Sequence, residues 1–261
     1  MGLRKEAGTL GGAEAAALRS AFARAYGIRD ERGHAYFAGL HGLPLPSWCA
    51  HDSQLFLPWH RAYLYYFERA LRDLEPSANL VWWDWTTDRS HAEGVPALFR
   101  RTAAWSNRNP LATGPVPLSP DDLGRFRADP RNAGALSDGD PPWTLRDPDP
   151  PDELPRADTI RRALVAPTFT DLSLLLEGIH SNVHVWVGGA MTLISVAAYD
   201  PLFWAHHAMI DRVWYLWQIG RYGKPPPPAL LGRALPPFPM TVAQTLDLAA
   251  LGYGYAVETA G

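Results

Sequence analysis

The distribution of proline limits the folds open to this chain more than any other feature of its sequence. Eleven of the 25 prolines lie between residues 109 and 158, together with four glycines. Proline has no backbone donor and clashes with the preceding helical turn, so this segment cannot continue as a helix. We expect a long irregular stretch that wraps the core, with one short helix capped at Ser119. Its expected apolar anchors are Trp105, Phe126, Trp143 and Leu145.

Regular helical periodicity occurs on both sides of this Pro-rich stretch. Apolar residues recur there at spacings of three and four, which is typical of helices with one buried face. The expected helices span residues 12–26, 30–40, 58–74, 171–187 and 201–220. Thr170 or Asp171 is the expected N-cap of the fourth helix. The pattern predicts a mainly α fold: a single domain over residues 1–261, with a four-helix core and long Pro-rich loops around it.

Composition and charge exclude several classes of function. The 24 basic and 27 acidic residues give a net charge of −3, so there is no basic patch for nucleic acid or for a membrane surface. No apolar run approaches the roughly 18 residues needed to span a bilayer. The first residues lack the apolar core of a signal peptide, and we expect a cytoplasmic protein, with export alongside a helper protein as the alternative. The single cysteine, Cys49, cannot form an intrachain disulfide.

The nine histidines fall into an early and a late group. His180 and His184 are four residues apart on an expected helix and therefore project from one face, where two imidazoles can reach one metal ion. A helix that merely carries two polar residues would show the same spacing. The argument for a metal site therefore needs the other histidines, which bring the set to six with three from each half of the chain. These are His41, His51, His60 and His207.

A set of six imidazoles without a carboxylate favours copper. Magnesium and calcium prefer oxygen ligands, and structural zinc favours four-coordinate sets of cysteine and histidine. Imidazole suits copper in both oxidation states. Two copper ions, each with three histidines and an open side, would be able to bind O₂ between them.

Two long motifs resemble those of the tyrosinase family, the type 3 copper proteins that include catechol oxidases and hemocyanins. The stretch HDSQLFLPWHRAYLYYFE at residues 51–68 is similar to the family's copper A signature. The stretch DPLFWAHHAMID at residues 200–211 is similar to its copper B signature, and HSNVHVWVGG at residues 180–189 to its copper B histidine pair. Tyr253-Gly254-Tyr255 resembles the aromatic pair that closes the family's catalytic domain. The resemblance therefore extends over the whole chain, and implies no C-terminal shielding domain here.

The resemblance implies a role for each of these histidines. It places copper A on His41, His51 and His60, with His34 as the alternative first ligand. It places copper B on His180, His184 and His207, and gives His206 a supporting role.

Three further residues acquire expected roles next to these ligands. Some relatives join the cysteine two residues before the second ligand to its ring as a thioether, so Cys49 and His51 are either crosslinked or leave a free buried thiol. Asp211 and Glu68 are expected to hydrogen-bond the ligand imidazoles, or else to form salt bridges with Arg61 or Arg212.

The activity implied is that of a copper-dependent oxidoreductase. Such an enzyme uses O₂ to oxidise o-diphenols or o-aminophenols, small aromatic phenolic substrates, to o-quinones or quinone imines. Family tyrosinases often have an asparagine directly after the first copper B histidine, where it and a nearby glutamate hold a water that deprotonates a phenol. Here Ser181 takes that position, with Asn182 next to it and Glu177 three residues before His180. We therefore expect weak ortho-hydroxylation of monophenols.

Other functions of the family stay open as alternatives. One is a full tyrosinase with monophenol monooxygenase activity, and another is an O₂-binding protein like the hemocyanins. Leu193 and Ile194 are expected at the pocket mouth, or else pack into the core. A separate copper-delivery helper protein, which some bacterial relatives use, is a possible partner.

Overall fold

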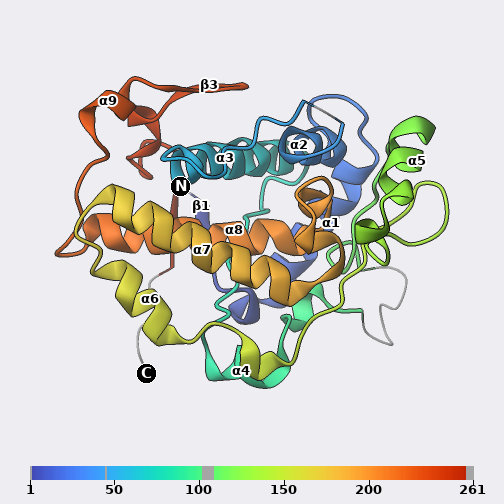
Figure 1. Cartoon of the computed structure of the whole chain (residues 1–261), viewed down its shortest axis with the longest axis horizontal. Coiled ribbons are helices and arrows are strands. Elements are labelled where there is room, and N and C mark those ends of the chain that lie inside the picture. The colour runs from blue at the N-terminus through green and yellow to red at the C-terminus, as the bar shows by residue number, and fades with distance from the viewer. Residues whose placement is uncertain (1, 45, 102–108, 257–261) are drawn as a thin grey trace.

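The computed structural model describes residues 2–44, 46–101 and 109–256, and this part of the chain is mainly helical (Figure 1). The three longest helices, α3, α7 and α8, have 19 residues each. The helices are α1 (Gly12–Tyr26), α2 (His34–His41), α3 (Phe56–Leu74), α4 (Asp88–Glu93), α5 (Pro120–Ala128), α6 (Ala157–Leu164), α7 (Phe169–Val187), α8 (Pro201–Ile219) and α9 (Pro228–Leu231). The mainly α fold predicted from the sequence is confirmed. No helix in the described ranges is both long and apolar enough to cross a membrane.

Capping residues explain where the two late helices begin. Thr168 accepts a hydrogen bond from the Asp171 amide and so caps α7, which makes the prediction of an N-cap at Thr170 or Asp171 wrong by two or three residues. The helix ends at Gly188, whose φ of 70° is a conformation that favours glycine. Asp200 caps α8, which begins at the predicted residue, Pro201. The short helices α4, α6 and α9 were not predicted.

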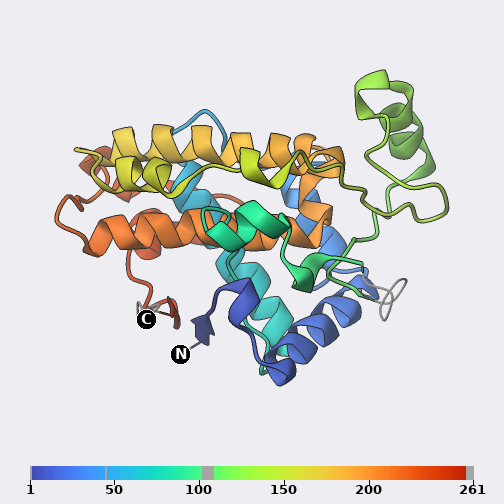
Figure 2. The ribbon, with the colours of Figure 1, turned by 90° about the horizontal axis from the view of Figure 1, so that it is seen from below.

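Helices α2, α3, α7 and α8 pack together and leave the site between them, and α7 and α8 run side by side in both views (Figures 1 and 2). Aromatic residues fill the contact between α3 and α8. The rings of Phe67 on α3 and Trp204 on α8 are stacked with centroids 3.7 Å apart, and Tyr63 lies 4.7 Å from the same Trp204 ring. These large buried rings hold the two helices at a fixed spacing.

The two ends of the described chain meet in a parallel strand pair. Strand β1 (Gly2–Arg4) pairs with β4 (Tyr253–Tyr255), and this brings Arg4 into the core. The Arg4 guanidinium lies 3.8 Å from the ring centroid of Tyr253 and donates to Glu68 on α3 and to Asp211 on α8. Buried charges of opposite sign therefore connect both strands to the helices that carry the site.

A second small sheet covers the outer side of α3. It consists of β2 (Ala234–Leu235) and β3 (Phe238–Thr241), which are antiparallel. Phe238 stacks on Tyr66 of α3, with ring centroids 5.1 Å apart, and the indole of Trp59 donates to the backbone oxygen of Pro236. The tail thus contributes to burial of the helix that carries His60.

The Pro-rich stretch wraps the helical core as predicted, and its short helix α5 begins after the predicted cap, Ser119. In both views α5 projects away from the other helices (Figures 1 and 2). Phe126 is buried, and Trp143 pairs with Pro115. The Leu145 amide donates to the backbone oxygen of Ala135, and its carbonyl oxygen accepts from the Ala190 amide. The fourth expected anchor, Trp105, lies outside the described residues.

Candidate metal centre

Four helices and one loop bring the six predicted ligands into one region. His41 is the last residue of α2, His60 lies in the second turn of α3, and His51 lies on the loop between them. His180 and His184 project from one face of α7, and His207 projects from α8. All of these imidazoles are buried except that of His51, which is half-buried.

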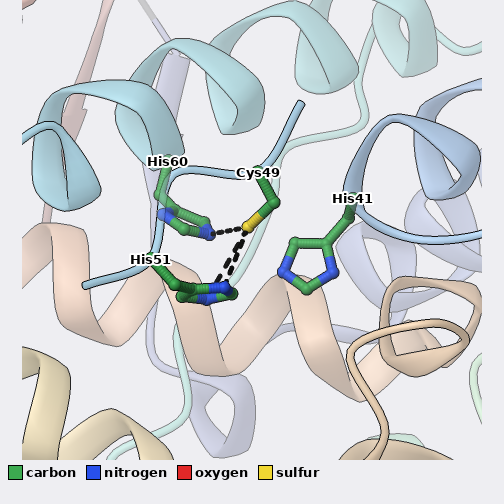
Figure 3. Close-up of side chains that lie close together, drawn as sticks. All are labelled: His41, Cys49, His51 and His60. Atoms are coloured by element: carbon green, nitrogen blue, oxygen red, sulfur yellow. Dashed lines mark hydrogen bonds between the residues drawn. The ribbon is translucent and has the colours of Figure 1, made fainter. Parts of the chain in front are cut away.

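The early ligands form what we call the A group, which contains His41, Cys49, His51 and His60 (Figure 3). Their donor atoms all lie within 4.8 Å of one another. The sulfur of Cys49 lies 3.3 Å from Nδ1 of His51 and 3.6 Å from Nε2 of His60. Cys49 therefore contacts two of the three predicted copper A ligands.

The late ligands form the B group, which contains His180, His184 and His207. Nε2 of His207 lies 3.2 Å from Nε2 of His180 and 3.3 Å from Nε2 of His184. Imidazole nitrogens about 2.0–2.1 Å from one metal ion, at near-tetrahedral angles, are roughly 3.3 Å apart. The spacing of these nitrogens therefore fits a single ion between them. His206 is buried and stacks on the His180 ring but is not part of the group.

The two groups lie next to each other. The rings of His60 and His207 are stacked with centroids 4.5 Å apart, and those of His51 and His180 are 5.6 Å apart. Ions held by the two groups would therefore be neighbours, as a dinuclear site requires.

Backbone carbonyl groups orient three of the imidazoles. A carbonyl oxygen can only accept a hydrogen bond, so in each of these rings Nδ1 carries the proton and Nε2 keeps a free lone pair. The Nδ1 hydrogen bonds run from His41 to Ile194 (3.2 Å), from His60 to Phe56 (2.8 Å) and from His184 to Met191 (2.7 Å). This arrangement is the one expected of metal ligands, which usually donate their other ring N–H to a fixed acceptor.

Burial keeps the six imidazoles neutral, which is the form that binds metals. It lowers the pKa of His184 to about 4 and holds the pKa of His41, His60, His180 and His207 well below 6.5, where neighbouring imidazoles lower it further. The Nε2 atom of His41 is buried without a hydrogen-bond partner. A donor set of imidazole nitrogens and one sulfur, without a carboxylate, fits copper and not magnesium or calcium.

Comparison with known proteins identifies the family. The family model described as the common central domain of tyrosinase matches residues 31–219, which is more than half of the chain and contains both groups. The chain belongs to the tyrosinase family. As a member of that family it binds two copper ions through its histidines, in the A and B groups.

The similar curated proteins include both tyrosinases and hemocyanins. The chain is 36% identical over 191 residues to a tyrosinase from Streptomyces lincolnensis, a match that covers 64% of each protein. It is 29% identical over 229 residues to hemocyanin units G and H from Sepia officinalis, covering 83% of this chain and 37% of the relative. The chain therefore spans less than two thirds of the length of these curated relatives.

A solved structure shares the fold over nearly the whole chain. A functional unit of octopus hemocyanin superposes with a TM-score of 0.80 at 24% identity, and the match covers 98% of this chain and 68% of that one. This chain and the hemocyanin unit therefore share one fold.

A pocket of about 240 Å³ opens over the two histidine groups. His41, His51, His180 and His184 are among the residues that line it, so the pocket reaches the metal ligands directly. Its volume is close to the lower end of the roughly 300–1,000 Å³ typical of small-molecule sites. A single aromatic ring is therefore the size of ligand that suits it.

The other predicted site residues divide between the pocket and its surroundings. Glu177, Ser181 and Ile194 line the pocket. Asn182 is exposed and Leu193 is half-buried against the core, and neither lines the pocket. Because Asn182 is one residue further along α7 than Ser181, its side chain points about 100° away around the helix.

Sequence reasoning missed Asp52, which lines the pocket directly after His51. Its backbone amide donates to the carboxylate of Glu177 at 2.7 Å, and its φ of 51° is a conformation that aspartate adopts more readily than most residues. Burial, together with the negative charge of Asp52, raises the pKa of Glu177. The one sequence feature that could have indicated a role for Asp52 was its position next to the predicted ligand His51.

The predicted hydrogen bonds of Glu68 and Asp211 to the ligand imidazoles are contradicted by the structure. Glu68 accepts from Arg4 and from the amide of Leu80, and Asp211 accepts from Arg4 and Arg61. Burial acts to raise the pKa of Asp211, but the charges of Arg61 and Arg4 outweigh burial and lower it. Both carboxylates form salt bridges, which was the alternative prediction, but Glu68 does so with Arg4 and Arg72 and not with either predicted partner. For Asp211 the partner is Arg61, whereas Arg212 lies over the ring of Trp82.

The alternative first ligand, His34, lies apart from both groups. Its ring is fully buried between aromatic side chains, with the Tyr26 ring 4.9 Å away. Both ring nitrogens lack a hydrogen-bond partner, and burial lowers the pKa of His34 to about 3. The structure thus selects His41, and not His34, for the A group.

Proposed function

We propose that this chain is an enzyme that uses copper and O₂ to oxidise o-diphenols or o-aminophenols to o-quinones or quinone imines. Two molecules of an o-diphenol and one O₂ give two o-quinones and two waters, so electrons and protons balance. The observation that supports this proposal most is the pocket over the two histidine groups, which is open to solvent and has room for one aromatic ring.

The chain's own residues have separate tasks in this reaction. When bound, the copper pair supplies the binding of O₂ and the transfer of electron pairs. The backbone oxygens of Ile194, Phe56 and Met191 fix the ring orientations of the ligands. Val185 and Ile194 offer apolar surface against which a phenol ring packs, and this contact excludes water from the metal centre.

Two hydrogen bonds support weak activity toward monophenols. The hydroxyl of Ser181 donates to the backbone oxygen of Glu177 at 3.0 Å, which is a local bond within α7. The carboxylate of Glu177 accepts from the amide of Asp52. Both side chains are therefore engaged with the protein, and a serine hydroxyl offers no carbonyl–amide pair with which to hold a water beside Glu177.

A substrate panel tests the proposal. The protein is loaded with copper, the metal is counted, and the consumption of O₂ is followed with a phenol, the matching catechol and the matching o-aminophenol. We expect about two copper ions per chain, rapid oxidation of the catechol or the aminophenol, and slow oxidation of the phenol. Loading with two copper ions but no oxidation of any of the three would contradict the proposal.

An oxygen-binding protein is the second candidate, and the long match to the Sepia hemocyanin favours it. The two candidates differ in what a catechol does to the oxygenated protein. When a catechol is added, a carrier would keep the absorption band of its oxygenated form. An enzyme would lose this band as quinone forms.

We also propose that Cys49 and His51 form the thioether that the family resemblance implies. In that step the Cys49 S–H and one ring C–H of His51 are lost, an S–C bond forms, and O₂ takes up the two electrons and two protons. The contact between Sγ and the His51 ring supports this proposal (Figure 3).

A further inference from the structure

The pocket over the metal centre is lined by carboxylates and by histidines, but not by lysine or arginine from the described part of the chain. Asp52 and Glu177 are the acidic residues among the described residues that line it, and no lysine or arginine is among them. Val185 and Ile194 add apolar surface to the same pocket, and both side chains are exposed. The side chains of the pocket therefore offer an incoming molecule an apolar wall and a negative charge. Bound metal ions would add positive charge at the histidines, so the contribution of the two carboxylates is measured by replacing them.

The two carboxylates are held close together at the edge of the metal centre. Asp52 directly follows the ligand His51, and Glu177 lies one helical turn before the ligand His180. The hydrogen bond from the Asp52 amide to Glu177 fixes their relative position. Within the described residues no hydrogen bond is recorded for the Asp52 side chain, which is exposed and free to face a ligand.

The floor of the same pocket indicates where the reacting ring lies. Nε2 of His41 is buried, lacks a hydrogen-bond partner and belongs to a residue that lines the pocket. A ring whose hydroxyls face the histidines must direct the substituent on its opposite side toward the pocket mouth. Asp52, which is exposed, and Glu177, which is half-buried, are the acidic lining residues that such a substituent can meet.

We propose that Asp52 and Glu177 select, among o-diphenols, those whose ring carries a short side chain ending in an ammonium group. This inference rests on the proposed function. A carboxylate roughly 7 Å from an ammonium group, at an effective dielectric constant between about 40 and 80, favours binding by a factor of about three to eight. The same carboxylate disfavours a substrate with a carboxylate tail by a similar factor.

Three catechols that differ mainly in the charge of the tail test the inference. These are dopamine, 4-methylcatechol and 3-(3,4-dihydroxyphenyl)propanoate, with tails that are positive, neutral and negative. We expect kcat/KM to fall in that order, with the ratio of the first to the last at about tenfold or more at low salt and smaller at high salt. Equal values for dopamine and the propanoate would overturn the inference.

Variants of the two carboxylates, with a matched control, test whether the preference for a positive tail comes from Asp52 and Glu177. Asp52→Asn removes the charge and keeps a residue that tolerates positive φ, and Glu177→Gln keeps an oxygen that accepts from the Asp52 amide. Each removes both the gain for dopamine and the penalty for the propanoate, and is therefore expected to reduce the dopamine-to-propanoate ratio by about tenfold or more. Asp138→Asn removes a charge that does not line the pocket and is expected to leave the ratio unchanged. An equal reduction in the Asp138 and Asp52 variants would overturn the inference.

A binding measurement separates this inference from the proposed function. Zinc cannot support the redox reaction, so the zinc-loaded protein binds catechols without turnover. Calorimetry with dopamine and the propanoate is expected to show the same preference as kcat/KM, reduced in Asp52→Asn. If no catechol is oxidised by the copper protein but this preference is present, the inference stands and the proposed function fails. If all three catechols are oxidised and neither the binding constants nor the kcat/KM values depend on tail charge, the inference fails and the proposed function stands.

Discussion

The carboxylate of Glu177 accepts a 2.7 Å hydrogen bond from the backbone amide of Asp52, and this bond ties α7 to the loop that carries His51. The two residues lie 125 positions apart in the chain. Each is close in sequence to a metal ligand, so the bond links the segments that carry the A group and the B group. It also occupies the glutamate that the family resemblance had associated with a phenol-deprotonating water.

Replacing Ser181 by asparagine tests why monophenol oxidation is expected to be weak. The Ser181 hydroxyl is engaged with the backbone of Glu177, whereas an asparagine amide would offer both a donor and an acceptor at the pocket. One added hydrogen bond to a water corresponds to about 0.5–1.5 kcal/mol, or a two- to twelvefold effect. We expect Ser181→Asn to raise monophenol turnover by that factor and to change diphenol turnover less than twofold, as measured by O₂ consumption. Ser181→Ala is the control, and a similar rise for both substrate classes would speak against this explanation.

Adjacent histidines on α8 provide a matched test of the ligand assignment. His207 belongs to the B group, whereas His206 stacks on His180 without joining the group. We expect His207→Gln to reduce the copper content from about two ions per chain to about one, and His206→Gln to leave it near two. Metal analysis after dialysis gives the count, and circular dichroism checks that both variants keep their helices. The reverse result would assign the ligand to His206.

The sequence predicted the helices because they depend on spacing along the chain, and the ligand set came from its resemblance to the family's copper motifs. The apolar pattern located α1 with its ends correct, and the spacing of His180 and His184 placed both imidazoles on one face of α7. The start of α7 was wrong because Thr168, Thr170 and Asp171 all have side chains that can cap a helix.

Spacing along the sequence could not predict contacts between segments that are far apart in the chain. The oxygens that orient His41 and His184 belong to the backbone, which is the same in every residue and carries no sequence signal. Asp211 was correctly placed one turn beyond His207, but its partner Arg4 lies 207 positions away in the chain. Spacing therefore identified the side of α8 on which Asp211 lies, but not the guanidinium group that contacts it.

The proposed crosslink between Cys49 and His51 has a direct signature in the mass of the protein. Loss of the thiol hydrogen and one ring hydrogen lowers the intact mass by about 2 Da relative to the reduced chain. Burial, reinforced by the charge of Glu177, raises the pKa of the Cys49 thiol, so an uncrosslinked thiol stays protonated. We expect the mass loss after copper loading in air, and no loss in the Cys49→Ser variant. An unchanged mass, with a thiol that alkylates fully after unfolding, would show that the crosslink does not form.

Acid is expected to destabilise the protein through His34. Burial lowers the pKa of its imidazole to about 3, whereas in the unfolded chain it is about 6.5. As pH falls below 6.5 the unfolded state takes up a proton that the folded state does not, so folding stability is lost down to about pH 3. At pH 5 this amounts to roughly 2 kcal/mol.

The variant His34→Leu removes this proton uptake. Both metal-free proteins are unfolded with urea, and the free energy of unfolding of the variant is compared with that of the unaltered chain. This difference is expected to move in favour of the variant by about 2 kcal/mol between pH 8 and pH 5. The measurement at pH 8 is the internal control for the change in packing. A constant difference across that pH range would show that His34 is not kept neutral.

Arg4 is expected to contribute more to stability than any exposed arginine. Its guanidinium is fully buried and connects β1 to Glu68 on α3 and to Asp211 on α8. Removing one partner of such a buried network leaves carboxylates without compensation and costs about 3–5 kcal/mol. Arg4→Ala is therefore expected to lower the free energy of unfolding by that amount, as measured with urea on the metal-free protein.

Two further variants show whether the loss of stability in Arg4→Ala comes from the burial and the geometry of the guanidinium group. Arg125 forms an exposed salt bridge with Asp122, and Arg125→Ala is expected to cost less than about 1 kcal/mol. Arg4→Lys keeps the charge but loses the planar group that reaches both carboxylates at once, so its cost should lie between those of the two alanine variants. If Arg4→Ala costs no more than Arg125→Ala, the buried network does not hold β1 against the helices, and packing of the Tyr253 and Tyr255 rings must do so instead.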